Sequence, residues 1–117
     1  MNSITNIVIS LVALLHLGFL VLEMFFWDHP FGRKTFHLTE EASASSATLA
    51  ANQGLYNGFL AAGLVWGVWS GQAQVKIFFL LCVVIAGIYG GLTAKRSILY
   101  MQGLPGLIGL LLVLFSG

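Results

Sequence analysis

The residue types that could do acid–base chemistry in this chain of 117 residues are few, and two of them share one apolar stretch. Glu23 and His16 are separated by two helical turns, so a helix would place both on one face, about 10 Å apart along its axis. An ionisable group within a membrane-spanning helix is costly and marks function by default. Glu23 and His16 are therefore our candidate catalytic residues, Glu23 as proton-transfer group or anchor and His16 as relay or floor.

Neutral polar side chains cluster in the other apolar stretches, at the ends that would lie in the same half of a bilayer as Glu23. We interpret them as ligand-binding candidates: Asn52, Gln53, Tyr56, Asn57, Tyr89, Thr93 and Gln102. The opposite half is expected to be almost purely apolar. We therefore expect a polar pocket between the helices. A simpler alternative stays open, in which Glu23 is hydrogen-bonded to Asn57 or Gln102 and only joins helices.

Several other kinds of site are not expected. His29 and His37 lie in a connecting segment, and no His-x-x-x-His or Cys-x-x-Cys spacing occurs, so no metal site is predicted. The single cysteine, Cys82, has no intrachain partner for a disulfide. A net charge of +1 argues against a nucleic-acid partner. The residues indicate no particular cofactor.

Composition determines the elements that must position these residues. The chain is 58% hydrophobic and 8% charged, with a mean hydropathy of +0.93, whereas about a quarter of the residues in a soluble domain are charged. Four stretches of about 20 apolar residues, each long enough to cross a bilayer, account for most of the chain. We predict an all-α membrane protein, a four transmembrane helix bundle in one domain (1–117), with helices at about 4–27, 47–70, 75–93 and 97–115.

The connection between the first two helices, residues 28–46, is expected to be a cytoplasmic loop with an interfacial segment. Phe31 and Phe36 bracket Arg33 and Lys34, which suits aromatic rings in the bilayer interface and cations at lipid phosphates.

Two further signals concern where helices begin. Thr39 followed by two glutamates is typical of a capped helix start, so the run of small residues at 42–51 could be helical and continue into the second span. We expect the last helix to begin near Ser97 and carry Pro105 inside it as a kink, because a helix starting at Pro105 would be too short to cross. The alternative is a short helix with Pro105 in its first turn.

The basic residues predict the orientation. Both expected loops on one face carry Lys/Arg pairs (Arg33-Lys34 and Lys95-Arg96), and the other face has only Lys76. By the positive-inside rule the paired residues are cytoplasmic. Four spans then place both termini on the same, outer side of a multi-pass protein of the cell (inner or plasma) membrane.

Four runs of residues carry a resemblance to a known family: His16 with Leu22-Glu23-Met24 and Trp27, the stretch from Asn52 to Gly63, Cys82 with the stretch from Ala86 to Gly90, and Gln102 with Pro105. Over nearly its whole length the chain resembles the domain of unknown function 1304 family, a group of small, mostly bacterial, integral membrane proteins. The resemblance implies four helices and a membrane location, and it supplies no activity, substrate or catalytic residue.

Three classes of function fit these observations. The pocket would bind or process a small amphipathic or lipid-like molecule. Glu23 would be the proton-transfer group or anchor, and Asn57, Tyr56 and Gln102 would be donors that orient the molecule. Alternatively, a dimer would be a proton-coupled small-molecule transporter with one Glu23 per subunit, although the polar residues stop halfway across. A third alternative is a structural subunit of a membrane complex. Membrane lipids are the expected partners, and the glycine-rich helix faces would allow a homo-oligomer.

Overall fold

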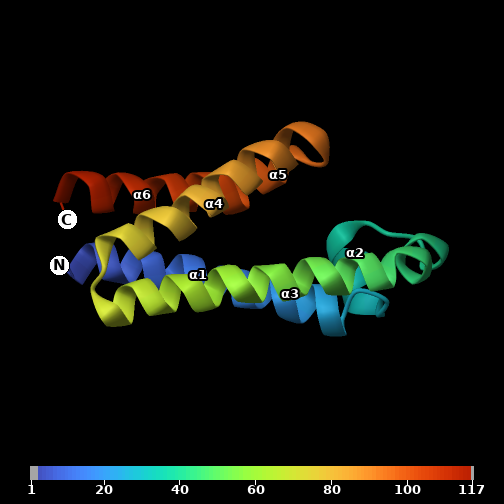
Figure 1. Cartoon of the computed structure of the whole chain (residues 1–117). Helices are drawn as coiled ribbons and strands as arrows, with labels where there is room; N and C mark the ends of the chain where they lie inside the picture. The colour runs from blue at the N-terminus through green and yellow to red at the C-terminus, as the bar shows by residue number, and fades with distance from the viewer. Residues whose placement is uncertain (1–2, 117) are drawn as a thin grey trace. The chain divides into compact units, whose positions relative to one another are not determined.

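The structure is a computed structural model that describes residues 3–116, and every regular element among them is helical (Figure 1). In chain order the elements are α1 (Ser3–Phe25), α2 (Pro30–Phe36), α3 (Glu40–Ser70), α4 (Ala73–Thr93), α5 (Arg96–Ile98), the π-helical turn η1 (Leu99–Gly103) and α6 (Leu104–Ser116). The predicted all-α class is therefore confirmed.

Three helical segments are long and apolar enough to cross a membrane: α1, α4, and the continuous segment Arg96–Phe115 that comprises α5, η1 and most of α6. The longest helix, α3, has 31 residues, but Asn52, Gln53 and Asn57 make its sequence more polar. These three segments therefore have the length and composition of membrane-spanning helices. A fourth crossing would have to be made by α3.

The fold consists of two compact units, one formed by residues 3–14 with 60–116 and the other by residues 15–59. In the first unit four helices contribute to one apolar core: Ile9, Val12 and Ala13 of α1, Ala61 and Leu64 of α3, Leu80 and Val83 of α4, and Leu110 and Val113 of α6. Mixing small with branched side chains lets neighbouring helices interlock at close range.

The α4–α6 hairpin of this unit depends on glycine. The two helices run side by side in Figure 1, and a Cβ atom at Gly87 would overlap the backbone of Gly103 in η1. The helix after the turn begins at Arg96 and continues through Pro105, as predicted. Its distortion is a π-helical turn, in which the amide of Leu104 donates to the carbonyl of Leu99. This wider turn makes room for the proline ring, which would clash with a regular α-helical backbone.

The second unit contains the connection that we expected to be a loop at 28–46, and much of it is helical. The Nδ1 atom of His29 accepts a hydrogen bond from the amide of Phe31 at 3.1 Å, and Pro30 occupies the first position of α2. Gly32 lies so close to the carbonyl of Phe26 that no side chain would fit there. The backbone of His37 is left-handed, with φ of 57°, and ends the helix.

Helix α3 then begins at Glu40 rather than at 47, and α1 ends at Phe25 rather than at 27. The Thr39 hydroxyl accepts a hydrogen bond from the amide of Ala42 at 3.0 Å, which confirms the predicted cap and the helical run that follows it. The small and polar residues of this run form a helix because the cap and the acidic first turn stabilise its start.

Candidate functional site

The centre of the candidate site is a hydrogen bond between α1 and α3 within the second unit. The Nδ2 atom of Asn57 donates to Oε1 of Glu23 at 2.5 Å. The expectation that Glu23 hydrogen-bonds to Asn57 or Gln102 of another helix is therefore confirmed for Asn57.

Glycines allow the two helices to approach closely enough for this bond. A Cβ atom at Gly54 would lie 2.7 Å from Met24 Cγ and 3.1 Å from Glu23 Cβ, and one at Gly58 would lie 2.7 Å from Leu20 Cδ1. The backbone of α3 therefore rests directly on the face of α1 that carries Leu20 and Glu23. These glycines have a packing role, as small residues do between helices in lipid.

The two partners differ in burial. Asn57 is only 7% exposed, and Glu23 is half-buried. Asn57 is the one hydrogen-bond partner given to Glu23 within residues 3–116. No buried side-chain oxygen or nitrogen in that range lacks a partner, so the second carboxyl oxygen, Oε2, retains some exposed surface. The geometry thus fixes one oxygen of Glu23 and leaves the other able to accept a hydrogen bond or carry a proton.

Beyond the end of α1, aromatic and polar side chains close over the same face of α3. The indole Nε1 of Trp27 donates to the hydroxyl of Ser46 at 3.0 Å, and its ring lies against Phe36 with ring centroids 4.9 Å apart. Ser46 in turn donates to the carbonyl of Ala42 at 2.6 Å. Trp27 is therefore held by α2 on one side and by α3 on the other.

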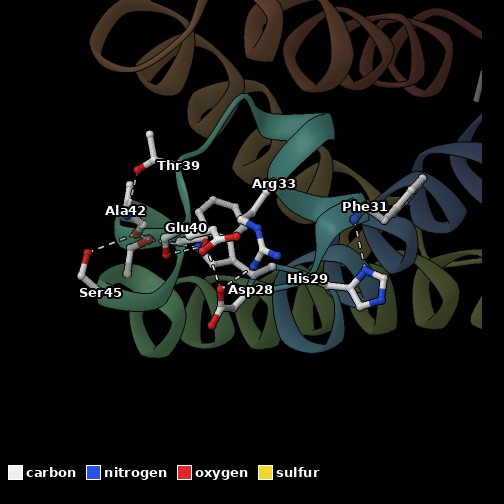
Figure 2. A network of polar contacts seen from close by, with 11 residues as sticks. Asp28, His29, Phe31, Arg33, Thr39, Glu40, Ala42 and Ser45 are labelled. Atoms are coloured by element: carbon white, nitrogen blue, oxygen red, sulfur yellow. Dashed lines mark hydrogen bonds and ion pairs between the residues drawn. The ribbon is translucent and has the colours of Figure 1, made fainter.

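The residue after Trp27 is the centre of a polar network, shown in Figure 2. Asp28 accepts hydrogen bonds from Arg33 Nη1 at 2.9 Å and from the buried hydroxyl of Ser43 at 2.8 Å. The contact with Arg33 is an ion pair within the connection, and the contact with Ser43 ties the end of α1 to the first turn of α3. Sequence reasoning missed this network, because none of its members lies at a regular spacing.

The remaining candidates occupy different environments. His16 is fully buried, and its ring meets Phe19 edge-on at 5.4 Å. Asn52, Gln53 and Tyr56 are exposed on α3, where the Tyr56 ring contacts Phe59. In the first unit, the exposed Thr93 donates to the carbonyl of Tyr89, also exposed, while Gln102 of η1 is 9% exposed. Glu23 and Asn57 are brought together from different helices, and a pocket common to all nine candidates is a proposal.

One buried ionisable group was not anticipated. Lys76 of α4 is fully buried, and its Nζ donates to the side-chain carbonyl of Asn6 in α1 at 2.8 Å. A Cβ atom at Gly67 of α3 would lie 2.8 Å from Lys76 Cγ. The lysine stem therefore crosses α3 at a glycine to reach α1, all within the first unit.

Asn6 and Lys76 lie at the edge of the half expected to be almost purely apolar, each one residue before an apolar run, 7–15 and 77–86. Sequence reasoning used Lys76 only as a charge for predicting orientation. A lysine in an apolar helix requires a polar partner, and Asn6, a carboxamide near the start of α1, was the available signal.

A groove lies apart from the candidate residues. An apolar groove of about 300 Å³ lies between α4 and the segment after it, lined by Val84, Ile88, Leu99, Tyr100, Gly103, Leu104 and Leu107. None of the candidate residues lines it. Within residues 3–116, no three His, Cys, Asp or Glu side chains lie close enough together to hold a metal ion.

Helical segments of membrane-crossing length, with a carboxyl group hydrogen-bonded between two helices, are the features of a small helical membrane protein. The sequence model of the DUF1304 family, described as a protein of unknown function, matches residues 10–114, and this chain belongs to that family. The chain is similar to the uncharacterized protein YpaA of Lactococcus lactis, with 34% identity over 107 residues that cover 88% of this chain and 90% of the relative. No solved structure matches.

Proposed function

We propose that this protein uses Glu23 to bind or process a small amphipathic or lipid-like molecule within the membrane. The observation that carries the proposal is the hydrogen bond from Asn57 to one oxygen of Glu23, with the other oxygen left accessible. A bond that merely joined two helices would need only an acceptor, which an amide could provide without the cost of an ionisable group in the membrane. A carboxyl group with one oxygen oriented can present the other to a ligand or exchange a proton there.

In this proposal α3 is the fourth span, and the protein is a multi-pass protein of the inner membrane with both termini outside. The shared core of the first unit supports this, because α3 contributes Ala61 and Leu64 alongside residues of three apolar helices. A helix satisfies its own backbone hydrogen bonds, so α3 can cross despite its amides if these face other helices. The buried Asn57 already does so.

Other candidate residues would complete the pocket in the cytoplasmic half. Tyr56, Asn52 and Gln53 lie within two turns of Asn57 along α3 and would orient the polar part of the ligand. His16 would form the floor or relay a proton, and Tyr89, Thr93 and Gln102 stay predictions from the sequence. Among the alternatives, the dimeric transporter is less well supported, because Glu23 contacts an amide of its own chain.

The test is to purify the protein in nanodiscs made from its own membrane lipids and identify the retained small molecules by mass spectrometry. We expect the wild type to retain an amphipathic molecule in stoichiometric amount and Glu23→Gln to lose it, because glutamine keeps the size and the hydrogen bond but not the proton exchange. Glu41→Gln is the matched control, since Glu41 is exposed in the first turn of α3. Identical retention by all three proteins would contradict the proposal.

A further inference from the structure

Packed side chains lie between Glu23 and the connection that joins α1 to α3. The α3 face that leads from the connection to Asn57 carries Ser46, Ala50 and Gly54, and the last two are buried. Trp27 lies at the entrance to this face, bonded to Ser46 and in contact with Phe36. At the inner end, Gly54 contacts Met24 and Glu23 so closely that it could not carry a side chain. Contacts therefore lie at both ends of this face, Trp27 with Ser46 and Gly54 with Glu23, and Ala50 is buried between them.

The closure is anchored at several points. Gly32 fixes α2 against the backbone of Phe26, and the Asp28 carboxylate joins Arg33 of α2 to Ser43 of α3. Three separate contacts thus hold the elements on either side of Trp27. A mobile connection would need none of them, and a side chain held on both sides is expected to stay in place.

Glu23 is nevertheless only half-buried, so its accessible part must face another direction. Most of the exposed side chains near it on the two helices are apolar or aromatic: Val21 and Met24 on α1, and Leu55, Tyr56 and Phe59 on α3, where the exposed amides Asn52 and Gln53 lie one turn before Asn57. On a helix that crosses a membrane, such an exposed surface faces hydrocarbon.

We propose that the ligand of Glu23 is a lipid-soluble, uncharged molecule that enters laterally from the bilayer, and that Trp27 is a positioning residue which keeps water out of the site from the connection. This inference rests on the proposed function, in which Glu23 is the ligand-facing group. It narrows the ligand class, because a charged, water-soluble molecule would have to pass Trp27. Excluding water also strengthens the interaction between the Glu23 carboxyl group and a ligand.

Two carbodiimides that differ in solubility test the proposal, since both add to protonated carboxyl groups. The protein in phosphatidylethanolamine–phosphatidylglycerol vesicles is treated, at one mildly acidic pH, with apolar dicyclohexylcarbodiimide or with a cationic water-soluble carbodiimide. Modified peptides are quantified by mass spectrometry. We expect the apolar reagent to modify Glu23, and the water-soluble reagent to modify Glu41 at least about tenfold faster than Glu23.

Trp27→Ala should raise modification of Glu23 by the water-soluble reagent by about tenfold, because it removes the closure. Trp69→Ala is the matched control, since Trp69 is 90% exposed on α3, and it should change neither reagent's pattern. Should Trp27→Ala fail to insert, Ser46→Ala decides, because it removes the acceptor of the Trp27 bond and otherwise only a bond to Ala42 within α3, and it should give a smaller increase in the same direction.

The proposal is overturned if the water-soluble reagent modifies Glu23 of the wild type as fast as Glu41, or if the variant that inserts leaves Glu23 protected. Failure of the proposed function gives a different result. In that case Glu23→Gln changes no retained molecule in nanodiscs, whatever the carbodiimide pattern.

Discussion

At the scale of single residues, two polar contacts join helices, Glu23 with Asn57 and Lys76 with Asn6, and only the first could be predicted from the sequence. The partner of Glu23 could be narrowed in advance to Asn57 or Gln102, because each is a polar residue in an apolar helix near the same expected membrane side as Glu23. The helical period places Glu23 on one face of its helix, and a carboxyl group within a membrane-spanning helix needs a polar partner on a neighbouring helix. The pair of Lys76 with Asn6 was missed, since the pairing depends on Gly67 letting the lysine stem pass over α3. A contact that involves three helices has no periodic signature.

The Lys76 contact leads to a prediction about stability. Asn6→Ala should lower the free energy of unfolding by about 1–3 kcal/mol, because it leaves a buried ammonium group without its acceptor. Adding Lys76→Met should recover at least half of that loss, since removing both polar partners together is often nearly neutral. Thermal unfolding of the purified variants in detergent measures both effects. Equal stability of wild type and Asn6→Ala would show that the bond contributes nothing.

At the scale of elements, the long helices and the Thr39 cap followed from composition and spacing, but the short elements did not. Helix α2 has seven residues, too few for a hydrophobic period, and His29 is not among the residues that usually cap a helix. Only Pro30 at its first position signalled it. The π-helical turn was missed for another reason. A proline predicts that the helix is distorted and leaves open which turn accommodates it.

Glycine packing between α4 and η1 gives the prediction at this scale. Gly87→Ala should cost about 1–3 kcal/mol, because the added methyl group would overlap the backbone of Gly103 and push the two elements apart. Gly18→Ala is the control: no atom lies within 4 Å of a Cβ atom there, so it should be neutral or stabilise α1 by up to about 1 kcal/mol. Both are measured by thermal unfolding in the same detergent. If the two variants unfold at the same temperature, α4 and η1 do not pack closely at Gly87 in the purified protein.

At the scale of the whole molecule, the all-helical class follows from composition, while the number of crossings depends on α3. Its amides lower its hydropathy, so length and composition single out three helices, and the shared core is the reason to count a fourth. Reporter fusions truncated after Ser43 and at the C-terminus test the count. We predict a cytoplasmic signal after Ser43 and an external signal at the C-terminus. A cytoplasmic C-terminus would mean that α3 does not cross, and that the proposed pocket is placed wrongly.

The candidate site could be predicted from the sequence only as far as its members can be assigned to helix faces. Burial of Asn57, accessibility of one Glu23 oxygen and closure by Trp27 depend on how side chains from three elements meet, and no spacing along the chain encodes that. These three features decide whether the carboxyl group is available to a ligand, and therefore matter most for function.

The central claim is that Glu23 holds a molecule from the bilayer, and an experimental density map of the protein in its own lipids tests it most directly. We predict an elongated non-protein density within hydrogen-bond distance of the Glu23 carboxyl group, approaching from the lipid side and absent from the map of Glu23→Gln. A wild-type map in which protein atoms alone surround the carboxyl group, unchanged in Glu23→Gln, would contradict the account.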